Sequence, residues 1–201
     1  MEQKKSTKQK ILDTARTLFN EMGYNTVSLR DIAKTVGISE GNLTYYFQKK
    51  ENLMEELLAN GEDTFPTSLP QTLEELDAMF LDLQQTVQNN LYFFLHYTQL
   101  SQISPKISQI QSTRYREMME KLCHALQNLH GVGLLRGEAF PAEYESVVDT
   151  LYLSIIYWAP FVELKKDAHA TCTEYRRHAW RCVYHLLTER GRNELRDMIQ
   201  I

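Results

Sequence analysis

Apolar residues recur at helical spacing along almost the whole of the 201-residue chain. Such spacing indicates amphipathic helices, because residues three or four apart share one helix face. The first of these stripes comprises Ile11, Leu12, Ala15, Leu18, Phe19 and Met22. No strand-like alternation is visible, and eight Gly and five Pro are few for a turn-rich β fold. We therefore predict an all-α protein of about nine or ten helices.

The clearest break in the helical pattern is at residues 64–70, which read TFPTSLP. Pro66 and Pro70 lie too close together for a helix to continue through them. This segment is the best candidate for a linker inside the chain. Beyond it we expect long helices at about 72–89, 91–102, 104–130, 142–164 and 171–189, and a short one at 192–199.

Three short helices are predicted within the first 47 residues. The first ends at Gly23, a residue suited to a helix C-terminus. Ser28 and Asp31 resemble a capping box that opens the second helix. Gly37 ends that helix, and Ser39 can cap the third. Two short helices joined by a tight turn are typical of a helix-turn-helix, whose second helix enters the major groove of DNA.

The third helix has the two faces that this function requires. Leu43 and Phe47 form its buried side. The opposite side offers small or hydrogen-bonding residues for base edges, which are Glu40, Gly41, Asn42, Thr44 and Tyr45. Donors for phosphates are expected at Thr26, Ser28, Tyr46 and Lys50. An Asn suits adenine, and Glu40 either accepts from cytosine or stays solvated.

These residues resemble a known family. Residues 24–53, YNTVSLRDIAKTVGISEGNLTYYFQKKENL, look like the signature of TetR/AcrR-type bacterial transcriptional regulators. The matching features are T-x-S-x-R-D-I-A, the V-G-I-S turn, G-x-L, Y-Y-F and K-E-x-L. The sequence departs from the family at Thr44, where many members have Tyr.

The resemblance implies both an organisation and roles. A helix-turn-helix DNA-binding domain would span residues 1–50, and a helical effector-binding and dimerisation domain residues 51–201. Arg30, Glu40, Asn42 and Thr44 would read bases, while the phosphate-holding residues would be Thr26, Ser28, Tyr45, Tyr46 and Lys50. The implied function is a transcriptional regulator, expected to be a repressor, that binds a palindromic operator in double-stranded DNA as a homodimer.

The charge distribution is consistent with a DNA-binding head. Residues 1–50 hold nine Lys and Arg against five Asp and Glu, a net charge of +4, and the remainder carries −8. A positive segment can approach phosphates, whereas the whole chain is acidic at −4. Lys4, Lys5, Lys8 and Lys10 form either a solvated tail or a basic arm that contacts DNA.

The last two long helices are candidates for the dimer interface, because in the family such helices pack against their copies in the partner chain. One is apolar almost all round and must be covered on most sides. The expected interface residues are Val148, Ile155, Tyr175, Ala179, Cys182, Val183 and Leu186. Burial within a single chain is the alternative.

An aromatic segment suggests a pocket for an unknown small effector of apolar or aromatic character. Apolar walls with a few polar tips suit such a ligand, although ordinary core packing would explain the same residues. The candidate lining residues are Phe94, His96, Tyr97, Tyr115, Met119, Tyr152 and Trp158.

Other classes of function have little support in the sequence. No P-loop, G-x-S-x-G, G-x-G-x-x-G or H-E-x-x-H motif is present, so we expect no enzyme and no cofactor. His178, Cys182 and His185 share a helix face but lack a standard zinc spacing, so no metal site is predicted. Three Cys and no membrane span indicate a cytoplasmic protein. A constitutive nucleoid-type DNA-binding protein and an unrecognised enzyme remain as alternatives.

Overall fold

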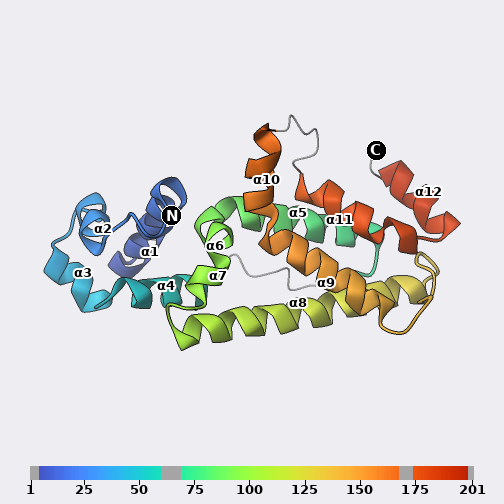
Figure 1. Cartoon of the computed structure of the whole chain (residues 1–201), viewed down its shortest axis with the longest axis horizontal. Helices are drawn as coiled ribbons and strands as arrows, with labels where there is room; N and C mark the ends of the chain where they lie inside the picture. The colour runs from blue at the N-terminus through green and yellow to red at the C-terminus, as the bar shows by residue number, and fades with distance from the viewer. Residues whose placement is uncertain (1–4, 60–68, 168–173, 199–201) are drawn as a thin grey trace. The chain divides into compact units, whose positions relative to one another are not determined.

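The computed structural model describes residues 5–59, 69–167 and 174–198 (Figure 1). Within these ranges the chain forms twelve α-helices and one 3₁₀ helix, and the only β pairing is an isolated bridge between Leu135 and Leu187. The predicted all-α class is therefore confirmed. Lys4, Cys172, residues 64–68 of the predicted linker, the start of the helix predicted at 171–189 and the end of the one predicted at 192–199 lie outside the described residues.

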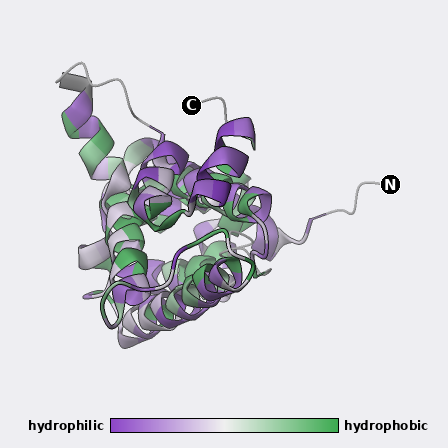
Figure 2. Ribbon diagram, turned by 90° about the vertical axis from the view of Figure 1, so that its right-hand side faces the viewer, coloured by the Kyte–Doolittle hydropathy of each residue, from purple (hydrophilic) through white to green (hydrophobic). Residues whose placement is uncertain are grey.

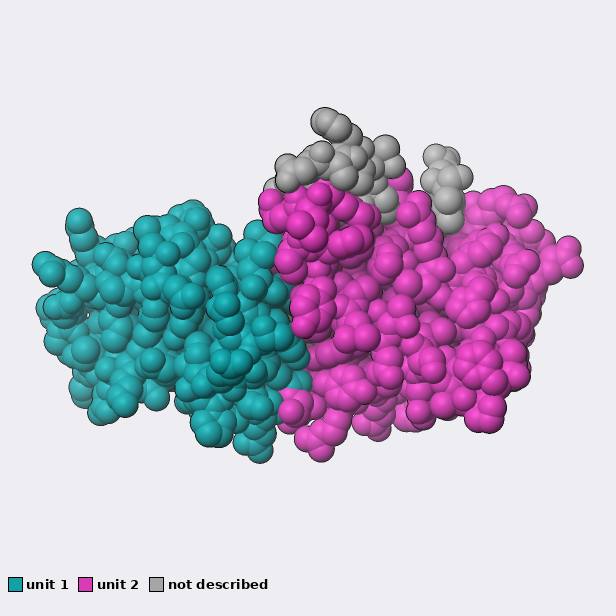
Figure 3. Space-filling model, viewed as in Figure 1, with its two compact units in different colours: residues 1–62, 89–111 teal, residues 63–88, 112–201 magenta. Residues whose placement is uncertain are grey.

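The chain divides into two compact units, shown in teal and magenta in Figure 3. Unit 1 comprises residues 1–62 and 89–111, and unit 2 comprises residues 63–88 and 112–201. The helices of unit 1 are α1 (Thr7–Met22), α2 (Leu29–Val36), α3 (Glu40–Tyr46), α4 (Lys50–Ala59), α6 (Leu91–Leu95), α7 (Tyr97–Leu100) and the first turns of α8 (Pro105–Gly131). Unit 2 contains the rest of α8 together with α5 (Leu73–Asn89), α9 (Glu143–Ile156), α10 (Trp158–Asp167), α11 (Tyr175–Val183), η1 (Tyr184–Leu186) and α12 (Glu189–Met198).

Unit 1 is built around α1. The helix begins after Ser6, whose side chain accepts a hydrogen bond from the Gln9 amide, and ends at Gly23 with φ of 84°. Its side chains Ile11, Leu12, Ala15 and Phe19 are buried, whereas Met22 at the end of the predicted stripe is 51% exposed. Figure 2 shows helices that carry both hydrophobic residues in green and hydrophilic residues in purple.

Unit 1 also includes α6, which packs on α1. The Asn20 side chain donates to the Asn89 carbonyl at 2.7 Å and accepts from the Tyr92 amide at 3.1 Å. The rings of Phe19 and Tyr92 lie 5.7 Å apart between centroids. The first and sixth helices are thus joined by both polar and apolar contacts.

Two of the helices predicted from the sequence are each divided. The one at 91–102 is interrupted at His96, and the one at 142–164 at Tyr157, where α9 and α10 are bent by 63°. Pro160 explains the second break, because its ring would clash with the carbonyl four residues earlier, at Ile156, where α9 ends. Among the described residues no single helix is long and apolar enough to span a membrane. The bent α9–α10 pair together reaches that length and apolar composition.

Helices α9 and α11 pack against each other in the core of unit 2. Tyr175 is fully buried, and its hydroxyl donates to the Leu151 carbonyl at 2.9 Å. On the other side of α11, Arg176 forms two 2.6 Å bonds to the Asp77 carboxylate of α5, and the Trp180 indole N–H donates to the same carboxylate at 2.8 Å. The helix α11 is therefore held between α9 and α5.

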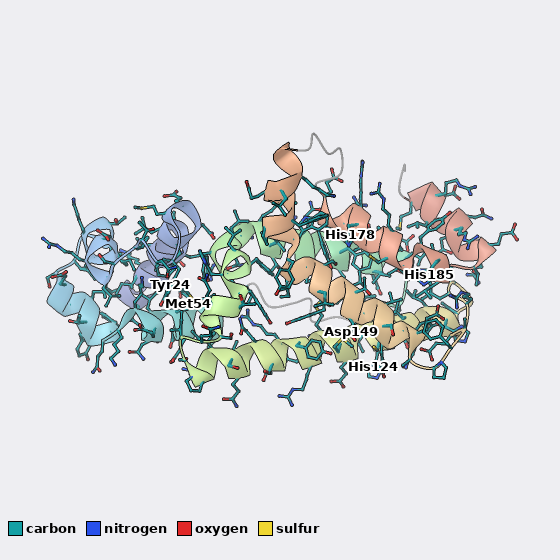
Figure 4. All side chains as sticks on the ribbon, viewed as in Figure 1. Tyr24, Met54, His124, Asp149, His178 and His185 are labelled. Atoms are coloured by element: carbon teal, nitrogen blue, oxygen red, sulfur yellow. The ribbon has the colours of Figure 1, made fainter. Side chains whose placement is uncertain are left out.

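A partly buried ion pair joins the loop before α9 to the first residue of that helix. Arg136 donates to both oxygens of Glu143, at 2.8 and 2.6 Å, and the Ala139 amide donates to the same carboxylate at 2.7 Å. The guanidinium first, and then the amide, lower the pKa of Glu143 to about 2. His185 of η1 lies 3.7 Å from this carboxylate rather than with His178 and Cys182 on α11 (Figure 4).

Candidate nucleic-acid interface

The turn between α2 and α3 has the conformation expected of a helix-turn-helix. Gly37 adopts a left-handed backbone, with φ of 79° and ψ of 34°, and its amide donates to the Ala33 and Lys34 carbonyls. Ser39 then caps α3 by accepting a hydrogen bond from the Asn42 amide. A glycine tolerates the left-handed conformation without the strain that a side chain adds. The turn therefore follows from two residues close in sequence.

The predicted capping box at the start of α2 is present. Ser28 accepts from the Asp31 amide, while its own amide and hydroxyl donate to the Asp31 carboxylate at 2.9 and 2.5 Å. These two hydrogen bonds, the side-chain one first, lower the pKa of the Asp31 carboxyl. The hydroxyl proton of Ser28 is thus donated to the Asp31 carboxylate. Its backbone amide is used as well, so Ser28 has no free donor for a phosphate in this conformation.

Helix α3 presents one buried and one exposed face, as the sequence predicts. Leu43 is fully buried and Phe47 is 3% exposed, which anchors the helix against the rest of the head. Residues on the other side are exposed and near-contiguous along the helix, namely Glu40, Gly41, Asn42, Thr44 and Tyr45. Small and polar side chains on an exposed helical face can reach base edges in a major groove.

The exposed residues differ in whether their polar groups already form hydrogen bonds within the protein. The Thr44 hydroxyl donates to the Glu40 carbonyl at 3.0 Å, so its proton stays within α3. Tyr45 is 82% exposed and packs edge-on against Tyr46, with the ring centroids 5.3 Å apart. Thr26 and Arg30, near the start of α2, are also exposed. Tyr45 and Arg30 are therefore both accessible from solvent.

Lys50, a predicted phosphate donor, binds backbone carbonyls within unit 1, and its sequence position does not reveal these contacts. Its ammonium donates to the Tyr24 carbonyl at 2.7 Å and the Val27 carbonyl at 2.9 Å. It also lies 4.3 Å from the centroid of the Tyr24 ring. Burial lowers the pKa of Lys50 and raises that of Tyr24 to about 12. Lys50 thus holds the connection between α1 and α2, and one N–H of its ammonium is left for a phosphate.

The neighbouring residue, Lys49, was not among the predicted phosphate donors. It is exposed in the turn that joins α3 to α4. An exposed lysine beside a helix that enters the major groove is a typical phosphate contact. The signal that could have found it is the Lys-Lys pair itself, since only one of two adjacent residues can face the interior.

The basic N-terminal segment is less free than a tail would be. Because Ser6 caps α1, Lys8 and Lys10 belong to that helix. The Lys8 ammonium lies 2.6 Å from the Glu56 carboxylate of α4, and Lys5 lies 2.7 Å from Asp13. Lys10 is exposed.

The residues expected at the dimer interface lie in the interior of unit 2. All but Cys182 are buried, most of them completely, and Cys182 is half-buried beside His178 at 3.5 Å. Side chains already buried in one chain gain nothing from a partner. The first of the two predicted helices, residues 142–164, exposes other apolar side chains, which are Leu153, Tyr157, Phe161 and Leu164.

The residues expected to bind an effector are divided between the two units. In unit 1, Phe94 is buried, Tyr97 is half-buried, and His96 lies 3.2 Å from the Gln99 amide oxygen. In unit 2 the Tyr115 ring packs edge-on against Tyr152, with centroids 4.9 Å apart. The remaining residues of unit 2 are the half-buried Met119 and the buried Trp158.

Among the described residues no group of three or more His, Cys, Asp or Glu side chains could hold a metal ion. The candidate site is instead the short helix α3, which has an exposed polar face and follows the turn at Gly37. This geometry is that of a helix-turn-helix DNA-binding protein.

Comparison with known proteins gives the family. Residues 11–57 match the family described as bacterial regulatory proteins, tetR family, and residues 51–195 match the family described as bacterial transcriptional repressor. The chain belongs to the TetR family of bacterial transcriptional regulators. It is accordingly a DNA-binding regulator of transcription and not an enzyme.

Individual relatives agree with this assignment. The Probable HTH-type transcriptional regulator YttP of Bacillus subtilis (strain 168) is 31% identical over 118 residues, which span 58% of this chain and 57% of that protein. A TetR-family regulator from Marinobacter aquaeolei VT8 has a TM-score of 0.81 at 20% identity, covering 96% and 97% of the two chains. A protein from Saccharomonospora viridis, solved in complex with choline, has a TM-score of 0.74 at 18% identity, covering 90% and 97%.

Proposed function

We propose that the chain is a homodimeric repressor that binds a palindromic operator and is released by a small apolar or aromatic effector. The observation that carries the proposal is the two-faced helix α3, with Leu43 buried and Asn42 exposed. A repressor is favoured because residues 51–195 match a family of transcriptional repressors. The DNA-binding domain would span residues 1–50 and the effector-binding and dimerisation domain residues 51–201.

The base-reading residues in this proposal are Arg30, Glu40, Asn42 and Tyr45. Asn42 has an exposed amide that can pair with adenine in two hydrogen bonds, and Arg30 suits guanine in the same way. Thr26, Tyr46 and Lys49 would hold phosphates.

The proposed dimer interface consists of the exposed apolar side chains on α9, on α10 and at the bend between them. Leu153 is 61% exposed and Leu164 is 72% exposed, with Tyr157 and Phe161 between them. Exposed apolar side chains cost free energy in water, and a group of them on neighbouring helices commonly marks an interface. Two copies would bring two α3 helices to half-sites about 34–36 Å apart on one face of DNA, which explains the expected palindrome.

The effector would contact the predicted residues that lie in unit 2, namely Tyr115, Met119, Tyr152 and Trp158. Tyr115 and Tyr152 offer ring faces, and the Tyr115 hydroxyl donates to Asp149 at 3.1 Å, so polar groups lie beside apolar ones. The Saccharomonospora viridis protein of the same fold was solved with a small ligand, choline. An effector can release DNA only if it binds the non-operator conformation more tightly than the operator-bound one.

Selection of bound sequences from a random duplex DNA pool tests the proposal. We expect the full chain to enrich one inverted repeat, with half-site centres about one helical turn or a multiple of it apart. Enrichment of sequences without symmetry, or of none, would contradict the homodimeric operator-binding function. A constitutive nucleoid-type protein would give the second of these results.

A further inference from the structure

A cavity of about 780 Å³ lies in unit 2 between α11 and α12. Its base is apolar, because Trp180 and Leu195 line it and are 3% and 1% exposed. Its walls are strongly cationic. Five arginines line it, which are Arg176, Arg177, Arg181, Arg192 and Arg196. Residues 51–201 carry a net charge of −8, so this concentration of positive charge runs against that of the surrounding sequence.

Two of the five guanidiniums are neutralised by carboxylates of the chain. Arg176 is held in a two-bond ion pair by Asp77 of α5, and Arg177 lies 3.0 Å from Glu174, the one acidic residue that lines the cavity. The Asp77 pair is part of the contact between α11 and α5, so Arg176 serves the fold.

The other three have no carboxylate partner among the described residues. Arg192 lies over the Tyr184 ring, 5.5 Å from its centroid, and the nearest side-chain acceptor of Arg196 is the Asn193 amide oxygen at 3.5 Å. Arg181 is exposed on α11. Like charges one helical turn apart repel each other, so this arrangement is unfavourable until an anion binds.

The spacing of the arginines is regular. Arg177 and Arg181 are four residues apart on α11, and Arg192 and Arg196 are four apart on α12. Residues four apart on a helix are neighbours on one face, with about 5–6 Å between Cβ atoms. Two such rows line one cavity from opposite helices, which suits a ligand bearing at least two anionic groups. The planar guanidinium fork matches the oxygens of phosphate and carboxylate groups.

We propose that this cavity binds a small organic anion bearing two or more phosphate or carboxylate charges. Its volume falls within the range of about 300–1,000 Å³ typical of small-molecule sites, and it is too small to admit a nucleic-acid duplex. The site is separate from the DNA-reading face, which lies in unit 1. It is also independent of the proposed aromatic effector residues.

Calorimetric titration of the full-length protein tests this inference. The probes are pyrophosphate for phosphate ligands and citrate for carboxylate ligands, with sodium chloride at matched ionic strength as the blank. The double variant Arg192→Gln, Arg196→Gln removes one row of charges. Arg190→Gln is the matched control, because Arg190 is exposed on the same helix and does not line the cavity.

We expect at least one probe to bind with one site per chain and to raise the melting temperature of the protein. The double variant should weaken that binding at least about tenfold, whereas Arg190→Gln should change it less than about twofold. Preference for pyrophosphate or for citrate then identifies the anionic group. Binding of neither probe above the chloride blank, or equal loss in the control, would overturn the proposal. So would a short single-stranded oligonucleotide that binds more tightly than both probes and depends on Arg192 and Arg196.

Discussion

Removing the Lys50 ammonium should loosen the connection between α1 and α2. In Lys50→Met the side-chain stem remains, but the Tyr24 and Val27 carbonyls lose a charged donor at 2.7 and 2.9 Å. A hydrogen bond from a charged group contributes about 1.5–3 kcal/mol, and a partly exposed cation–π contact about 0.5–1 kcal/mol. Burial lowers the pKa of Lys50, which shows that desolvation offsets part of this gain. Because Lys50 is half-buried, water can replace part of the rest, and we expect a net loss of about 1–2 kcal/mol.

Amide hydrogen exchange is the appropriate assay for this change. Both tryptophans, Trp158 and Trp180, lie in unit 2, so tryptophan fluorescence does not report on this connection. A loss of 1–2 kcal/mol corresponds to roughly 5–30-fold faster exchange in residues 24–29. Lys49→Met is the matched control and should leave exchange unchanged, because Lys49 is exposed. Equal exchange in Lys50→Met and the unaltered protein would refute the structural role of Lys50.

Three further predictions concern unit 2. Gly191→Ala should destabilise it by about 1–3 kcal/mol in urea denaturation, because a Cβ there would lie 2.3 Å from the Leu134 carbonyl oxygen. Gly131→Ala, where a Cβ meets nothing within 4 Å, should cost no stability; a similar loss in both would count against the packing argument. The pKa of Glu143 is about 2, so its stabilising contribution is present above its ordinary pKa of about 4.3 and is lost as the pH falls from about 5 toward 2. Glu143→Gln should flatten the stability profile in that window, and an unchanged acid transition would argue against the ion pair. Tyr157→Glu should convert the proposed dimer to monomers in sedimentation measurements, and a dimer of unchanged affinity would place the interface elsewhere.

The parts of the molecule that were predictable depend on residues close in sequence. The capping box of Ser28 and Asp31, the turn at Gly37 and the cap at Ser39 each involve residues within one or two helical turns. The buried Leu43 follows from helical spacing alone. Such features follow from local chemistry and do not require knowledge of the tertiary fold.

The parts that were missed depend on tertiary contacts. Helical spacing marks Tyr175 as apolar-facing, but it does not say whether a partner chain or α9 covers it. Lys50 and Lys49 are equally basic in the sequence, and only the position of the Tyr24 carbonyl distinguishes their roles. The apolar pattern is continuous across the end of α9 and the start of α10, so only the steric effect of the Pro160 ring indicates the break between them.

Operator recognition in our proposal depends on base contacts made by the exposed face of α3. The most direct test compares the sequences that the unaltered protein and Asn42→Ala select from the same random duplex pool. We predict that Asn42→Ala loses the preference for adenine at one position in each half-site, a discrimination of about 1–3 kcal/mol, and keeps the other preferences. Selection of an identical site by both proteins would contradict the claim, because Asn42 would then not contact a base.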